Sequence, residues 1–403
     1  MKENLIARNR YLVYASLIVL FFVNYRLPTL SGYFNLTSPS MGVANVDFYA
    51  YYRGGQAYNL GKEPYAGTRD GQTYKYPPTM VPLYGMLAKM DYDSARHLWL
   101  AIYLSVFSLV LAWAIWSSPV HDRFPILALV CAMLLISYPF AYLIRQGQID
   151  LLVGSLNFAS LIAYMQRRKN ISALLLALAA LIKLNPVFLL ITYVVFLRDW
   201  KYLIRFTAAI CLLILISFLF VSPDWYRAYA LEVLPAQTKS DPFAYNQTPL
   251  RFFAGDRYLP RLLTICGMGI LVLFAWWSGK RQTAVSGTTT NDFQSPQSRF
   301  AIMAFFTINT AFTLLFSGYA WIMAYVWFIL PLATLTPYLI RNSRWWTAAG
   351  MSLALLGTNS VVMEGVILNA TNMLGATLCV IFLGATLVKP GAMLALRQSV
   401  RAS

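Results

Sequence analysis

Charged residues are scarce in this chain of 403 residues, of which Asp, Glu, Lys and Arg make up only 12%. Soluble domains carry about 25% charged residues, whereas hydrophobic residues here reach 59%. Because half of the usual solvating charge is missing, a soluble globular domain is excluded. We therefore expect an integral, multi-spanning membrane protein.

Cysteine and histidine are also scarce. Each of the four cysteines lies inside an apolar run, where it packs as a small hydrophobe, so a disulfide scaffold is excluded. His97 and His121 are the only histidines, and no cluster of carboxylates or histidines suggests a metal site. We expect no cofactor and no metal.

The net charge of +17 is not that of a nucleic-acid binder, because the basic residues form short clusters between long apolar runs. That distribution is typical of a protein oriented in a membrane. We expect membrane lipids as partners and no nucleic acid.

Long apolar runs supply the candidate spans, since a helix needs about 20 apolar residues to cross a hydrocarbon core of about 30 Å. Three of the runs, 151–165, 171–186 and 187–197, are short for this purpose. We predict an all-α, polytopic transmembrane protein with about 12 spans, forming one membrane domain over 1–403. The runs are 11–27, 97–117, 124–144, 151–165, 171–186, 187–197, 204–221, 261–278, 300–316, 321–340, 345–363 and 372–388.

The orientation follows from the positive charges. With a cytoplasmic N-terminus, more than half of the 32 Lys and Arg residues fall in short cytoplasmic segments, as the positive-inside rule requires. The long loops 28–96 and 222–260 then face the extracytoplasmic side. The Ser/Thr/Gln-rich stretch 279–299 is interpreted as a flexible cytoplasmic linker.

Function is sought in the two outer loops, because charges within the apolar runs are almost absent and no internal repeat is visible. In the first loop, residues 46–60 form a plausible helix that ends at Gly61 and lies at the membrane interface. Asp47 is in its first turn, where the helix dipole favours the ionised form. Asp47 is thus a candidate general base; the alternative is that it only supports the helix N-terminus.

Further polar residues gather where apolar runs meet the outer side. Tyr76 precedes two prolines that fix an extended turn, and the neighbouring Lys75 either contacts phosphate or extends to the interface. Gly147 ends a helix within YLIRQGQID, which also carries Arg145 and Gln148. Each of these signals is weak when taken alone.

Two later segments add to this set. Lys183 follows an apolar run and precedes Pro186, which breaks the helix; an end position favours functional use and simple snorkelling about equally. Asn246 and Gln247 lie in the second outer loop.

The order of these motifs is more informative than each motif. D-F-x-x-Y at Asp47, Y-x-Y-P-P, G-Q after a helix, I-K-x-x-P and then N-Q-T together resemble the polyprenol-phosphate-sugar-dependent membrane glycosyltransferases of family 87. These belong to the GT-C superfamily, and their best-known members are mycobacterial phosphatidylinositol-mannoside mannosyltransferases. The resemblance covers about residues 10–340. Where members of the family usually carry a histidine in S-x-x-W-x-H, this chain has Met323.

The resemblance implies a GT-C-like hexosyltransferase of the cell inner (plasma) membrane that inverts the anomeric carbon. Its donor is a polyprenyl-phosphate sugar, with mannose favoured over other hexoses or a pentose, and its acceptor is an unknown glycan or lipid hydroxyl. Asp47 matches the catalytic aspartate. We expect donor-phosphate contacts from Lys183, Arg145 and Lys75, and sugar or acceptor contacts from Gln148, Asn246, Gln247, Tyr51 and Tyr76.

Two other classes remain open on the residues alone. A lipid or sugar transporter or flippase would share the polytopic body but perform no covalent chemistry. A non-catalytic assembly factor would tolerate substitution of Asp47. Convergence of Asp47, Lys183 and Asn246 on one outward-facing site would favour the transferase.

Overall fold

The computed structural model describes residues 47–65, 74–237, 248–256, 258–286, 295–317, 320–341 and 371–388. Within these ranges the regular structure is helical and no β-strand occurs. The prediction of an all-α fold is therefore confirmed. The predicted runs 11–27 and 345–363 lie outside the described residues.

Five helical segments among the described residues are long and apolar enough to cross a membrane. The predicted count of twelve is not confirmed, although four shorter apolar helices accompany these five. The five are α5 (Tyr92–Ser117), α10 (Trp200–Ser217), most of α13 (Leu259–Ser286), α14 (Pro296–Phe316), and η7 (Ile322–Phe328) continued by α15 (Ile329–Arg341).

The run expected at 124–144 is not one straight helix. It is divided into α6 (Val120–Ile136) and α7 (Tyr138–Gln146), which are bent by 64° at the break. Pro139 explains the break, because it has no N–H to continue the helix of α6 and is tolerated only in the first turn of a helix, where it lies in α7. Ser137 caps the new helix by accepting from the N–H of Phe140. The bent pair is a sixth candidate span.

Two short helices form an antiparallel hairpin next to this bend. They are α8 (Asp150–Met165) and α9 (Lys169–Ile182), which are in contact near their turn through Ser160 and Ser172 and at their open end through Asp150 and Lys183. After α9 the chain continues as a 3₁₀ helix, Asn185–Leu189, and a π-helix, Ile191–Phe196. The side chain of Asn309 on α14 donates to the carbonyl of Phe188 in this irregular segment. The hairpin therefore brings the start of α8 beside the end of α9.

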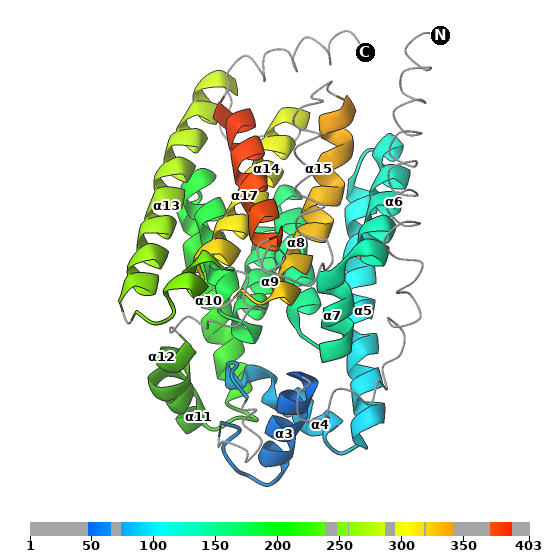
Figure 1. The fold of residues 1–403 in the computed structure, drawn as a ribbon, viewed down its shortest axis with the longest axis vertical. Coiled ribbons are helices and arrows are strands. Elements are labelled where there is room, and N and C mark those ends of the chain that lie inside the picture. Colours follow the sequence, from blue (N-terminus) through cyan, green and yellow to red (C-terminus); the bar gives the residue numbers. More distant parts are fainter. Residues whose placement is uncertain are drawn as a thin grey trace.

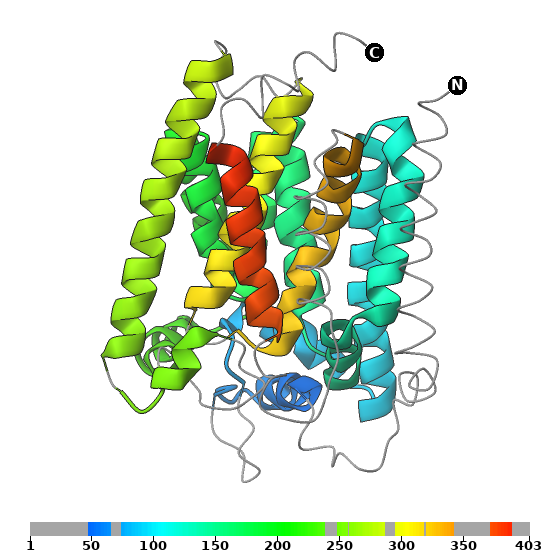
Figure 2. The same cartoon turned by 45° about the horizontal axis from the view of Figure 1, so that its top comes forward.

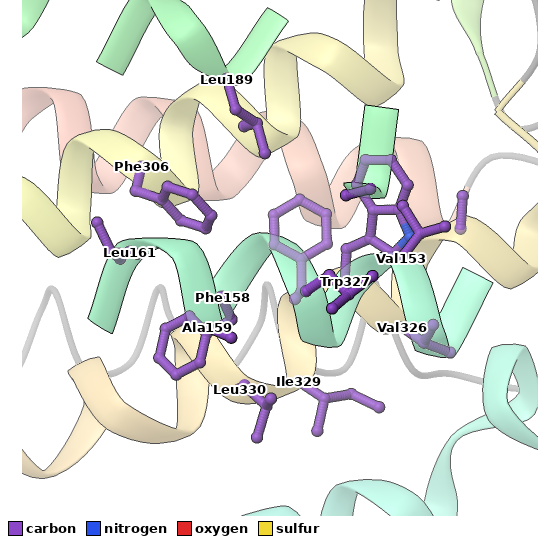
Figure 3. Close-up of a cluster of buried hydrophobic side chains, with 14 of the residues drawn as sticks. Val153, Phe158, Ala159, Leu161, Leu189, Phe306, Val326, Trp327, Ile329 and Leu330 are labelled. Carbon is purple, nitrogen blue, oxygen red and sulfur yellow. The ribbon is translucent and has the colours of Figure 1, made fainter. Parts of the chain in front are cut away.

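The start of α8 is fixed by tight packing in the core. Gly154 lies against Trp327 of η7, so that a Cβ at Gly154 would be 2.8 Å from Trp327 Cδ1. Small residues permit such close helix approach in membranes. Figure 3 shows this cluster, in which Val153 and Phe158 of α8 lie near Phe306 and Trp327.

The two predicted outer loops lie at the same end of the bundle. Figure 1 shows α3 (Asp47–Asn59) and α4 (Val81–Leu87) below the long helices, with α11 (Pro223–Ala228) and α12 (Leu234–Gln237) at the same level. The turned view agrees (Figure 2). Tyr226 of α11 contacts Thr79 through their hydroxyls at 2.9 Å. This end of the bundle is therefore built from both loops.

The segment expected as a linker, 279–299, differs in part from the structure. Helix α13 continues to Ser286 and α14 begins at Pro296, so most of its described residues are helical. Residues 287–294 lie outside the described ranges.

Candidate active site

Helix α3 presents Asp47 at its first position. The helix predicted over 46–60 is confirmed as Asp47–Asn59, and Gly61 has the expected left-handed conformation with φ 66°. Its packing on α4 depends on Gly55, because a Cβ there would lie 2.1 Å from the carbonyl oxygen of Tyr84. The backbones of α3 and α4 are thus in close contact, which fixes the position of α3.

The turn between α7 and α8 holds the N-terminus of α3. Gln146 Oε1 accepts a hydrogen bond from the backbone N–H of Asp47 at 3.1 Å. Gly147 ends α7 with φ 64°, as predicted, and a Cβ there would lie 2.7 Å from Phe48 Cβ. Trp99 donates from Nε1 to the carbonyl of Gly147 at 2.9 Å, which fixes the turn in place.

Gln148 connects the carboxylate of Asp47 to a pair of tyrosines. Its Nε2 donates to Asp47 Oδ2 at 2.9 Å, and its Oε1 accepts from Tyr51 OH at 2.7 Å. The hydroxyl of Tyr76 lies 3.3 Å from that of Tyr51 and 3.3 Å from Gln148 Nε2. Four of the predicted site residues, Asp47, Tyr51, Tyr76 and Gln148, therefore share one hydrogen-bonded cluster.

Aromatic packing holds this cluster rigidly. The ring of Tyr51 stacks on Tyr84 with centroids 5.0 Å apart, and both rings contact Trp99 edge-on. Tyr51 is buried, and its hydroxyl donates a hydrogen bond to Gln148 Oε1.

Lys183 lies at the end of α9, where it forms a buried ion pair. Its Nζ is 2.8 and 2.9 Å from the two carboxylate oxygens of Asp150, the first residue of α8. Asp150 is fully buried and the Lys183 side chain is 13% exposed. The sequence did not identify Asp150 as the partner of Lys183. The hairpin of α8 and α9 explains the pairing, since Asp150 and Lys183 both lie at its open end.

The ion pair acts electrostatically on Asp47. Burial raises the pKa of Asp47 from its ordinary value to about 6; the hydrogen bond from Gln148 and the charges of Lys183 and Lys75 lower it, while Asp150 raises it. The sequence led us to expect that the helix dipole favours the ionised form of Asp47. Desolvation by burial, which raises the pKa, outweighs this effect. A carboxylate with this pKa is suited to act as a base near neutral pH.

The remaining predicted residues lie in different places. Lys75 is exposed beside Tyr76, and its charge acts on Asp47. Arg145 is half-buried in the last turn of α7, where its carbonyl accepts from Arg96 at 2.6 Å. Asn246 and Gln247 lie outside the described residues.

Met323, which occupies the histidine position of the resemblance, is buried in η7. Within the described residues, no group of three or more His, Cys, Asp or Glu side chains has the arrangement of a metal site.

The site joins a partly buried carboxylate, a buried amide that hydrogen-bonds it, and an ammonium group within electrostatic range. Such a set has the groups needed to remove a proton from a hydroxyl and to stabilise negative charge on a leaving group. The apolar helices define a polytopic membrane protein, and these groups lie at one end of its bundle.

The sequence pattern of glycosyltransferase family 87 matches residues 74–291, more than half of the chain. The chain belongs to this family and is a membrane glycosyltransferase. Gln148, Asp150 and Lys183 lie within the matched range, and Asp47 precedes it. Searches of curated proteins and of solved structures found no match.

Proposed function

We propose that the protein is an inverting hexosyltransferase that moves a sugar from a polyprenyl-phosphate donor to an acceptor hydroxyl on the extracytoplasmic side. Mannose is the favoured hexose, and the cell inner membrane is the proposed location. The observation that carries this proposal is the cluster in which Gln148 links Asp47 to Tyr51 and Tyr76, with the Lys183 charge acting on Asp47.

Asp47 is the proposed general base. As the acceptor oxygen forms its bond to the anomeric carbon, its O–H bond breaks and Asp47 takes the proton. The bond between the anomeric carbon and the phosphate oxygen breaks at the same time, and its electron pair leaves with the phosphate. Displacement in one step from the opposite face inverts the anomeric configuration.

Lys183 is the proposed contact of the departing phosphate, with Arg145 and Lys75 as further cationic contacts. A cation beside the leaving oxygen is most effective in a site that excludes water, because it stabilises the charge that develops there. Lys183 retains donor capacity beyond Asp150, since an ammonium group carries three N–H donors. Gln148, Tyr51, Tyr76, Asn246 and Gln247 are the proposed sugar or acceptor contacts.

A donor panel tests this proposal. The purified protein is incubated with polyprenyl-phosphate mannose, glucose and arabinose in the presence of membrane lipid and glycan acceptors. The products are analysed by mass spectrometry, and the anomeric configuration by NMR. We expect a glycosylated product with inverted configuration from one donor, absent for Asp47→Asn. A product with retained configuration contradicts the proposed displacement.

A further inference from the structure

We propose that Gln148 is a positioning residue for Asp47. Its hydrogen bond occupies one carboxylate oxygen of Asp47 and leaves the other oxygen to receive the proton of the acceptor. This inference deepens the proposed function, since it rests on Asp47 as the base. It adds a second role for a side chain that is also a proposed sugar or acceptor contact. In the structure, Gln148 is buried and its Nε2 donates to Asp47.

The amide of Gln148 has one orientation that satisfies its neighbours. Its Oε1 lies 2.9 Å from the backbone nitrogen of Ile149, which only donates, and 2.7 Å from Tyr51 OH. If the amide were turned over, its NH₂ group would face the N–H of Ile149, and its oxygen would face the Asp47 carboxylate. Both contacts would be repulsive in a buried site. Nε2 is therefore held toward Asp47 Oδ2.

The same turn fixes the backbone of Asp47. Gln146 Oε1 accepts from the Asp47 N–H, and Gly147 permits the close approach of Phe48. Asp47 is thus held at its main chain and at one carboxylate oxygen by neighbouring residues of the α7–α8 turn. Among the described residues no hydrogen bond reaches Oδ1 of Asp47. Oδ1 is the oxygen that this geometry leaves for the proton.

The charged and titratable groups around Asp47 come from four segments. They are Tyr51 on α3, Lys75 and Tyr76 before α4, Asp150 on α8 and Lys183 after α9. Gln148 differs from all of them because it does not titrate and donates directly to the carboxylate. Its removal takes away a hydrogen bond to the ionised form and leaves the surrounding charges in place.

A direct titration of the Asp47 carboxyl group tests the inference. The pH-dependent infrared difference spectrum of the purified protein is measured, and that of Asp47→Asn is subtracted from it. We expect Gln148→Met to raise the titration midpoint by about one pH unit, as the loss of a hydrogen bond to a charged group predicts. Gln148→Asn, which keeps an amide but shortens its reach, should also raise it and serves if Gln148→Met fails to fold.

Tyr52→Phe is the matched control, since Tyr52 lies on α3 but donates to the carbonyl of Met90, away from Asp47. Its midpoint should equal that of the unmodified protein. Unchanged midpoints in the folded Gln148 variants would overturn the inference.

Transfer from polyprenyl-phosphate mannose provides the second readout. The acidic limb of the kcat/KM profile should move to higher pH by the same amount in Gln148→Met, which a merely structural role would not produce. A shifted infrared midpoint in a protein that transfers no sugar from any donor would support the positioning by Gln148 and reject the proposed function. Sugar transfer by the wild type, together with unchanged infrared midpoints in the folded Gln148 variants, would support the proposed function and reject the positioning by Gln148.

Discussion

The ion pair between Asp150 and Lys183 provides a test that separates stability from catalysis. Asp150 is fully buried and the Lys183 side chain is 13% exposed, so Lys183→Met leaves an uncompensated buried carboxylate. Removing one partner of a buried pair costs about 3–5 kcal/mol. The double variant Asp150→Leu/Lys183→Met replaces both charges by apolar groups, and such replacement is often neutral or stabilising.

We therefore expect Lys183→Met to lower the unfolding temperature in detergent, and the double variant to restore most of it. Sugar transfer should not return with the stability, because the cation for the leaving phosphate is still missing. Removal of one such group lowers kcat by about 10²–10³-fold. Thermal unfolding and transfer rates are measured on the same preparations. Recovery of transfer in the double variant would show that the Lys183 charge serves the fold alone.

Four further results are expected. Because the pKa of Asp47 is raised to about 6, kcat/KM should rise as the pH increases through 6; a flat profile from pH 5 to 8 would contradict this. Because the pKa of Asp47 is higher in the folded than in the unfolded state, its contribution to folding stability is fully present at a pH below the unfolded-state pKa. This contribution is lost as the pH rises through 6. Asp47→Asn should thus be more stable than the wild type at pH 8, by up to about 3 kcal/mol, but not at pH 3.5, as unfolding measurements will show. Gly55→Ala should lower stability and activity, since its Cβ would meet Tyr84 O, whereas Gly269→Ala in an open part of α13 should be neutral or slightly stabilising in thermal unfolding. Gly147→Ala should reduce transfer more than it reduces folded yield, because it displaces Asp47 through the neighbouring residue; equal losses would contradict this.

Local signals in the sequence predicted several elements of the site correctly. Gly61 and Gly147 end helices with positive φ, and the helix that begins at Asp47 is present. Such features depend on a few neighbouring residues, so that a sequence reports them directly. The family resemblance, stated from the order of motifs, is confirmed by the match over residues 74–291.

The features that were missed depend on contacts between distant segments. Gln146 holds Asp47 across 99 positions, and Asp150 meets Lys183 across 33. The bend before α7 is a different case, because Pro139 is visible in the sequence whereas hydropathy alone shows the run as continuous. Hydropathy reports how apolar a segment is, but the partners of its polar residues are set by packing. The catalytic and binding roles of all the site residues, Asp47 and Lys183 included, remain predictions.

The central claim is that Asp47 is the base for sugar transfer, and a single pair of variants tests it most directly. Asp47→Asn is compared with Asp93→Asn, which removes an exposed carboxylate in the first turn of α5. Initial rates of transfer are measured with the polyprenyl-phosphate sugar that the wild type uses. We expect Asp93→Asn to match the wild type, and Asp47→Asn to be folded but to form no detectable product. Turnover by Asp47→Asn at a rate near that of the wild type would contradict the account.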